Sequence, residues 1–269
     1  MFQIESNSLL CQNINCVDLF LLYFVRAKVD PMWQGTVTNP FLTRLFYIIS
    51  GDAIITVDKC TEIRMEAGNW YLLPAGRSFS YCCDGEMEHL GFQLKLCDID
   101  GIDLFRDSAG ILPLADKKNR AAFFMQMLDR HKLLDGLMFR QEIYALLFDF
   151  IKAHRITLPD RTLSPCVTKA ITYIRKNLSV QLTTAAVAEA TLVSVSTLVK
   201  HFKSELSMSV HDYIYEIVMT EAAQALLKSN LLVMHISENF GFCDQFYFSR
   251  RFREKFGISP RAYRKANYV

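Results

Sequence analysis

The fold of the C-terminal part of this chain is decided by residues 236–264, which read ISENFGFCDQFYFSRRFREKFGISPRAYR. Gly241 has no Cβ and can adopt the positive φ that a tight turn between two helices needs. Asp244 is placed to cap the next helix, because its carboxylate can accept hydrogen bonds from the free N–H groups of the first turn. Gly257 predicts the end of that helix, and Ser259 followed by Pro260 predicts the start of another.

The helix predicted after Asp244 has two different faces. Phe248, Phe252 and Phe256 recur every four residues and predict a stripe that packs in the core. The opposite face, at about 100° per residue, carries a different set of side chains: Phe246, Ser249, Arg250 and Arg253. A helix with one apolar face to hold it and one cationic, hydrogen-bonding face to present is suited to the major groove of DNA.

The same stretch resembles a known signature. Its pattern GF-x-D-x-x-x-FS-x-x-F-x-x-x-x-G-x-SP-x-x-Y-R is similar to that of the AraC/XylS family of transcription regulators. The resemblance is strongest over residues 164–265. It implies two helix-turn-helix units joined by a long helix, behind an N-terminal domain that senses a ligand or forms a dimer.

An earlier part of the chain repeats this stretch, which favours two helix-turn-helix units. Seven positions pair at a constant offset of 50 residues: Ser194, Leu198, Lys200, Phe202, Lys203, Ser209 and Tyr213 with Asp244, Phe248, Arg250, Phe252, Arg253, Ser259 and Tyr263. Before the turn the offset becomes 49, so the second turn is one residue longer. The first copy lacks both glycines and has Leu192 and Ser207 in their places.

Residues 209–228 read as one continuous helix between the two units. Twenty residues at 1.5 Å each make about 30 Å, close to the roughly 34 Å between successive major grooves on one side of DNA. The repeat is therefore long enough to span one helical turn. Val218 stands where the resemblance leads us to expect an arginine, which bears on how rigidly the two units are held.

The expected DNA-contacting residues come from the exposed faces of both units: Ser196, Val199, Lys200, Lys203, Gln245, Phe246, Ser249, Arg250 and Arg253. We expect Arg250 to read guanine O6 and N7, with Phe246 against a thymine methyl group. Ser249 can reach a base or a phosphate, while Arg253 and Lys203 mainly neutralise phosphates. Ser196, Val199 and Lys200 do the corresponding work in the first unit. Because that unit lacks its glycines, we expect its base reading to be less strict.

The distribution of charge favours double-stranded DNA as a partner of the C-terminal part. The whole chain of 269 residues carries a net charge of only +2. From Arg161 onward there are 14 Lys and Arg against 8 Asp and Glu, a net charge of +6, which leaves the first 160 residues at −4. A basic portion behind an acidic one is typical of a DNA-binding module attached to a domain with another role.

The N-terminal part reads as strands and turns. Five segments are rich in β-branched and aromatic residues, namely 20–25, 44–49, 53–57, 70–73 and 90–96. The order FYIISGDAIITVD…EAGNWYLLPAGRSFSY resembles half of a cupin, with a strand, a glycine turn, a strand and a Gly-x-x-x-x-x-Pro-x-Gly corner. We therefore expect an α+β protein whose N-terminal part is a cupin-like β-barrel. Such a barrel can hold a small molecule in its mouth.

Enzymatic cupins bind a metal through several histidines and a carboxylate, whereas this segment contains only His89. A lone histidine is more often a packed or surface residue than a ligand. We therefore expect no metal, no cofactor and no enzymatic activity. The alternative, a cupin-type enzyme with a helical DNA-tethering domain, is separated from this by measuring bound metal.

Residues 117–154 change to helical spacing, with a break expected near Asp135 and Gly136. The two helices can supply ordinary core or pair with another subunit, and the family resemblance favours dimerisation. Residues 156–163 are read as a linker in a polar stretch with two prolines. The expected organisation is a sensor and dimerisation domain over 1–155, the linker, and a double helix-turn-helix domain over 164–269.

The eight cysteines form no CxxC pair: Cys11, Cys16, Cys60, Cys82, Cys83, Cys97, Cys166 and Cys243. No signal peptide or membrane span is recognised in the sequence, so reduced cysteines and a cytoplasmic location are expected. The interpretation is a sequence-specific transcription regulator, controlled by a small-molecule effector or by dimerisation. A homodimer is expected and a membrane partner is not. Activation and repression both stay open, and RNA polymerase is an expected partner of an activator.

Overall fold

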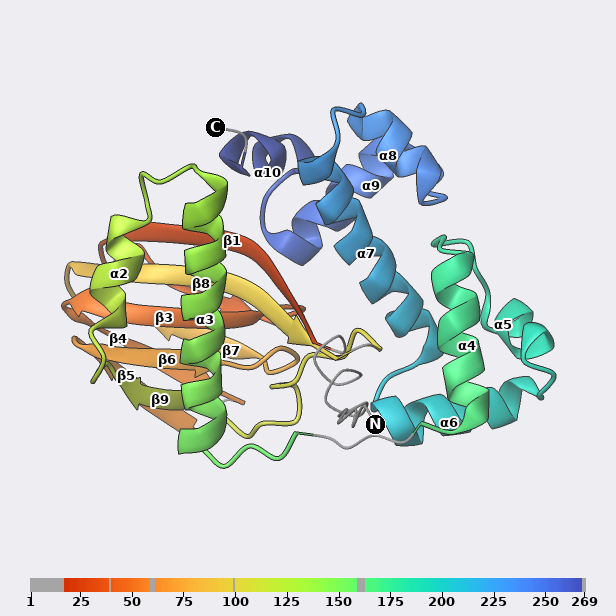
Figure 1. Ribbon diagram of the computed structural model, residues 1–269, viewed down its shortest axis with the longest axis horizontal. Coiled ribbons are helices and arrows are strands. Elements are labelled where there is room, and N and C mark those ends of the chain that lie inside the picture. Colours follow the sequence, from red (N-terminus) through yellow and green to blue (C-terminus); the bar gives the residue numbers. More distant parts are fainter. Residues whose placement is uncertain (1–16, 39, 59–60, 99, 159–162, 268–269) are drawn as a thin grey trace, which may run out of the picture. The chain divides into compact units, whose positions relative to one another are not determined.

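The computed structural model describes residues 17–38, 40–58, 61–98, 100–158 and 163–267 (Figure 1). The chain divides into two compact units, Met1–Pro159 and Asp160–Val269, which we call the N-terminal and the C-terminal unit. Within the described ranges, the N-terminal unit contains β-sheets and two helices, and the C-terminal unit is helical. The predicted α+β composition is confirmed in this form. The expected linker 156–163 lies partly outside the described residues.

Among the described residues, the strands of the N-terminal unit form two antiparallel sheets. The five-stranded sheet has the order β1 (Asp18–Val29), β8 (Met87–Cys97), β3 (Thr43–Ser50), β6 (Asn69–Leu73), β9 (Leu112–Ala115). The four-stranded sheet has the order β2 (Gly35–Val37), β7 (Phe79–Cys82), β4 (Asp52–Val57), β5 (Thr61–Glu66). All five predicted segments lie within strands, namely β1, β3, β4, β6 and β8.

The five-stranded sheet is buried on both faces, because alternate residues of a strand point to opposite sides. On β3, Leu45 and Tyr47 belong to the core that includes α2 (Arg120–Gln126) and α3 (Leu133–Ala153). Phe46 and Ile48 belong to a second core shared with the four-stranded sheet. In Figure 1 the two helices cross the face of the sheet opposite β4 and β5.

The expected helix break near Asp135 and Gly136 is wrong. Both residues lie in the first turn of α3, and the break lies at residues 127–132 instead. The Asp135 carboxylate accepts a hydrogen bond from the backbone N–H of Lys132 at 3.1 Å. An aspartate at this third helical position stabilises the start of a helix. The Asp135-Gly136 pair therefore lies at the start of helix α3, whereas the sequence pattern predicted a break between two helices there.

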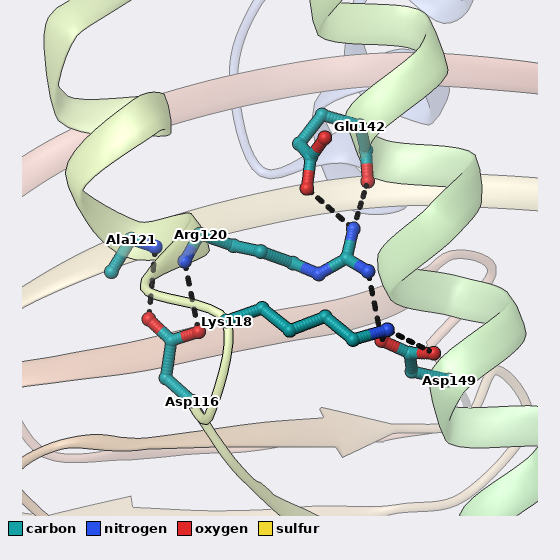
Figure 2. A network of polar contacts seen from close by, with 6 residues as sticks. All are labelled: Asp116, Lys118, Arg120, Ala121, Glu142 and Asp149. Atoms are coloured by element: carbon teal, nitrogen blue, oxygen red, sulfur yellow. Dashed lines mark hydrogen bonds and ion pairs between the residues drawn. The ribbon is translucent and has the colours of Figure 1, made fainter.

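A network of ion pairs joins α2 to α3 around Arg120, whose side chain is only 6% exposed (Figure 2). The guanidinium donates to the Glu142 carboxylate at 2.5 Å and to Asp149 at 2.8 Å. Asp149 also accepts from Lys118, and Asp116 accepts from the backbone N–H of Arg120 at the start of α2. With two carboxylates and a backbone carbonyl as partners, the buried charge is compensated.

The described part of the C-terminal unit consists of helices: α4 (Pro165–Lys176), α5 (Thr184–Ala190), α6 (Val195–Leu206), α7 (Val210–Lys228), α8 (Val233–Asn239), α9 (Gln245–Phe256) and α10 (Pro260–Asn267). Ser164 caps α4 by accepting from the N–H of Val167. Ser209 caps α7, which runs unbroken over 19 residues and confirms the predicted connecting helix.

The structure bears on the cysteines and on possible membrane-spanning helices within the described residues. Cys82, Cys83, Cys97, Cys166 and Cys243 are free thiols, while Cys11, Cys16 and Cys60 lie outside the described residues. None of the helices in the described ranges combines the length and the apolar character that crossing a membrane requires.

Candidate nucleic-acid interface

Helix α9 begins at the cap that the sequence predicts. The Asp244 carboxylate accepts hydrogen bonds from the backbone N–H groups of Phe246 and Tyr247, both at 2.7 Å. The hydrogen bond from Tyr247 is the largest cause that lowers the pKa of Asp244, and the bond from Phe246 lowers it further. The helix ends at Gly257, which adopts a left-handed φ of 82°. Both ends of the predicted recognition helix are thus fixed by local hydrogen bonds and backbone conformation.

The apolar face of α9 is buried as predicted. Phe248 and Phe252 are fully buried and Phe256 nearly so. Their rings form a continuous series, with centroids 5.6 Å apart for Phe248 and Phe252 and 4.4 Å apart for Phe252 and Phe256. Tyr263 of α10 packs against Phe252 at 5.5 Å. This packing fixes the rotation of α9, and therefore which side chains it exposes.

The opposite face of α9 is accessible. The Phe246 side chain is 78% exposed, although phenylalanine is among the residue types most often buried. Arg250 and Arg253 are exposed, while Gln245 and Ser249 are half-buried. The Arg250 guanidinium lies over the Tyr247 ring, 5.5 Å from its centroid. All five residues predicted for this unit thus retain access to solvent.

The cations of this face differ from their neighbours on the same helix. Arg251 is paired with Glu254 at 2.8 Å and lies over the Tyr215 ring, and Lys255 lies over the same ring. Arg250 and Arg253 form no ion pair with any carboxylate of the described residues. Arg251 and Lys255 are therefore held against Tyr215, whereas Arg250, over the Tyr247 ring, and Arg253 remain exposed on the other face without an ion pair to a described carboxylate.

Helix α6 repeats this arrangement in the first helix-turn-helix unit. Ser194 caps it by accepting from the N–H of Thr197 at 3.1 Å. Leu198, Phe202 and Leu206 form the buried face. The predicted contact residues are all exposed: Ser196, Val199, Lys200 and Lys203. The Ser196 hydroxyl shares a 2.9 Å hydrogen bond with the cap Ser194, and the two lysines have no ion-pair partner among the described carboxylates.

At two equivalent positions the two helix-turn-helix units share a left-handed φ although their residues differ. Leu192 adopts a φ of 59° where the second unit has Gly241 at 78°. Ser207 adopts a φ of 53° where the second unit has Gly257 at 82°. The positive φ is therefore kept without the glycines, and two non-glycine residues accept an unfavourable conformation.

Two hydrogen bonds connect the first helix-turn-helix unit directly to the second, and the sequence does not indicate them. Residues 179–181, between α4 and α5, lie on the turn between α8 and α9. Val180 donates its backbone N–H to the carbonyl of Phe240 at 2.9 Å. Gln181 donates its side-chain amide to the carbonyl of Gly241 at 2.8 Å. Val218, where an arginine was expected, is fully buried in α7.

Two capped helices, each in a helix-turn-helix frame and each with two exposed cations at repeat-related positions, define the C-terminal unit as a helix-turn-helix DNA-binding module. Residues 187–266 match the family described as a helix-turn-helix domain. The multiple antibiotic resistance protein MarA of Escherichia coli is 35% identical over 95 residues, which cover 35% of this chain and 75% of that protein. The chain belongs to the AraC family of transcription regulators. It is therefore a DNA-binding regulator of transcription.

Similarity also extends beyond this module. The Msm operon regulatory protein of Streptococcus mutans is 24% identical over 268 residues, 94% of this chain and 95% of that protein. Among solved structures, ToxT of Vibrio cholerae with a bound unsaturated fatty acid is similar with a TM-score of 0.57. That match covers 90% of this chain and 94% of ToxT at 13% identity, which shows a shared fold.

Proposed function

We propose that the C-terminal unit places α6 and α9 in two successive major grooves on one side of double-stranded DNA. The observation that carries this proposal is the repeat of exposed cations, Lys200 and Lys203 on α6 and Arg250 and Arg253 on α9. The connecting helix α7 has 19 residues. At 1.5 Å per residue it extends about 28 Å, a length comparable to the roughly 34 Å groove repeat.

Within this arrangement the nine residues have different roles. Arg250 reads a guanine edge, and the exposed ring of Phe246 contacts a thymine methyl group. Arg253 and Lys203 neutralise phosphates, which sets affinity and position. Ser249 and Gln245 can hydrogen-bond a base or a phosphate, and Ser196, Val199 and Lys200 act similarly in the first helix-turn-helix unit.

Selecting binding sequences from a random DNA pool tests whether one chain contacts two successive major grooves. Two conserved patches one helical turn apart support it, and a single patch contradicts it.

We also propose that α3 forms a dimer contact between two copies of the chain. The first turns of α3 expose several large apolar side chains, with exposed fractions of 82% for Leu133, 66% for Leu134 and 57% for Leu137. Helix pairing between subunits is a common way to bury such a surface. Light scattering of the full chain, compared with Leu134→Glu, tests this. The control is Leu232→Glu, at a similarly exposed leucine of the C-terminal unit. A monomeric wild type contradicts the proposal.

The N-terminal unit serves, in this proposal, as a cupin-like domain that binds a small-molecule effector. Two facts support that role over the enzyme alternative. His89 is buried between the rings of Trp33 and Phe46, and within the described ranges no three His, Cys, Asp or Glu side chains are grouped so that they could hold a metal ion. The relatives named above are regulators, and ToxT was solved with a fatty acid bound. Metal analysis of the purified protein distinguishes an effector-binding domain from a cupin-type enzyme, since stoichiometric metal would favour the enzyme.

A further inference from the structure

The N-terminal unit contains a small cavity between its two sheets. Its volume is about 120 Å³. Aromatic side chains make up much of its wall, and the polar groups are few: Arg44, His89, Gln93, Tyr23 and Tyr81. A concave, mostly aromatic site with a small number of polar groups is the usual form of a small-molecule site.

The register of three strands explains why this space exists. Tyr23 on β1, Gln93 on β8 and Arg44 on β3 lie opposite one another in one row across the sheet. In the next row Gly91 of β8 lies between Val25 and Phe46. Because side chains at alternate positions share a face, these rows point the same way, towards the core between the sheets. Gly91 contributes no side chain, so the central strand leaves the floor of the cavity open.

Arg44 is an unusual residue for this position. Its guanidinium lies over the Phe79 ring, 5.3 Å from the centroid, and no carboxylate of the described residues forms an ion pair with it. Burial lowers the pKa of Arg44, with the nearby Tyr81 and Tyr23 opposing that shift. An arginine stays charged in proteins even so. A desolvated cation without a partner anion is unfavourable, unless its partner arrives from outside.

His89 adds a second unsatisfied polar group to the same wall. Its side chain is buried, and Nδ1 has no hydrogen-bond partner among the described residues. Burial lowers the pKa of His89 to about 4, so the imidazole is neutral near pH 7 and adds no charge of its own. It can donate or accept one hydrogen bond, depending on its tautomer.

We propose that this cavity binds a small organic carboxylate, with the carboxylate on Arg44 and the rest of the molecule among Trp33, Phe46 and Phe79. The proposal rests on the proposed effector role of the N-terminal unit and names the class of effector. Arginine matches a carboxylate because its planar guanidinium can donate two parallel hydrogen bonds. The neighbouring aromatic rings favour the apolar remainder, and His89 provides a hydrogen bond to one further polar substituent.

The volume limits the ligand to one ring or a short chain. A cavity of about 150 Å³ is known to hold a benzene molecule, and this one is smaller, about 120 Å³, so a ring acid fills it and extends past Trp33 towards the outer hollow. A long-chain fatty acid therefore does not fit in it. Trp33 is shared between this cavity and an outer hollow lined by Lys28, Asp30 and Glu88, and its ring centroid lies 4.4 Å from that of Tyr81. Entry past Trp33 places this side chain in contact with the ligand.

The test uses the full chain with two probe acids, benzoate and hexanoate, and their neutral amides, benzamide and hexanamide. Binding is measured by calorimetry and by tryptophan fluorescence, since Trp33 lines the cavity while Trp70 is buried in the other core. We expect saturable binding of at least one acid and none of its amide. Arg44→Met should weaken acid binding about 10- to 100-fold, the usual worth of hydrogen bonds to a charged group. Failure of both acids to bind, or equal binding of acid and amide, overturns the proposal.

Two further variants separate ligand binding from a structural role. In the free protein Arg44→Met should leave the melting temperature unchanged or raise it, because an apolar side chain replaces a half-buried charge without an ion-pair partner among the described residues. A lowered melting temperature together with unchanged acid binding means that Arg44 is structural and overturns the proposal. Gly91→Val fills the floor and should abolish binding in a folded protein, with Gly91→Ala as the milder control, since a Cβ there meets neighbours only at 3.5 Å. Acid binding without any change in DNA affinity would contradict the effector role and leave the site itself standing.

Discussion

Gln181 donates its side-chain amide to the backbone carbonyl of Gly241 at 2.8 Å, and this bond joins the first helix-turn-helix unit to the turn of the second. The adjacent backbone bond from Val180 to Phe240 strengthens the same connection. In Figure 1 the loop between α4 and α5 accordingly lies beside the end of α8. The relative orientation of the two recognition helices therefore depends on this contact as well as on α7.

The first prediction follows from this bond. Gln181→Ala removes one donor and should lower affinity for a DNA site that engages both units by about fivefold, equivalent to about 1 kcal/mol for one hydrogen bond. Affinity for DNA that carries one half of the site should stay the same, because each unit is intact. Fluorescence anisotropy on both DNAs measures this. Gln224→Ala, on α7 and away from the contact, is the matched control. Equal losses on both DNAs would show that Gln181 does not act through orientation.

The second prediction concerns Leu192, which is 92% exposed and has a φ of 59°. Leu192→Gly removes the strain of a left-handed leucine and little packing, so it should stabilise the protein by about 1 kcal/mol. At the equivalent position Gly241→Ala should destabilise it, because a Cβ there would collide with the Ser179 side chain. Urea unfolding measures both changes. A destabilised Leu192→Gly would mean that the exposed leucine makes a contact that outweighs its strain.

Local signals in the sequence were sufficient for much of the fold. The cap at Asp244, the stop at Gly257 and the phenylalanine stripe all depend on residues a few positions apart, and all are found as predicted. The strand β5 was missed because it is largely charged, with only Met65 buried, so it lacks an apolar pattern. The start of α3 was misplaced because Asp-Gly is a turn signal in most contexts.

Contacts between distant segments could not be predicted in this way. The bond from Gln181 to Gly241 joins residues 60 positions apart, and a glutamine in a loop carries no sign of its partner. Arg44 looked like an ordinary residue at a strand start. Its place opposite Gln93 became visible only once the register of β3 against β8 was known. For the DNA interface, the sequence predicted which residues are accessible, and their contacts with DNA stay predictions.

The third prediction separates the two exposed arginines of α9, Arg250 and Arg253. Arg250→Ala should cost about 1–3 kcal/mol on the selected DNA site and little on random DNA, because a base contact is lost. Arg253→Ala should weaken both about equally and lower the salt slope by about 1, because a phosphate contact is lost. Binding titrations over a range of salt concentrations measure the difference. The assignment fails if both variants lose the same affinity on selected and random DNA.

The fourth prediction concerns pH. The pKa of Asp244 is lower in the folded state than in the unfolded state, because its carboxylate caps α9. Its stabilising effect is therefore fully present above the unfolded pKa and is lost as the pH falls through the folded pKa. Asp244→Asn keeps a capping oxygen and should show a smaller loss of helical circular dichroism on acidification below about pH 4. An identical acid profile for wild type and Asp244→Asn would contradict this role.

The central claim is that one chain reads two successive major grooves with α6 and α9. Hydroxyl-radical footprinting of the full chain on its selected DNA site tests it most directly, with Lys200→Ala and Arg250→Ala as companions. At saturating protein we predict two protected patches on one side of the DNA, separated by one helical turn for each bound chain, with each variant weakening only its own patch. Protection of a single groove per chain, or weakening of both patches to the same extent by either variant, would contradict the account.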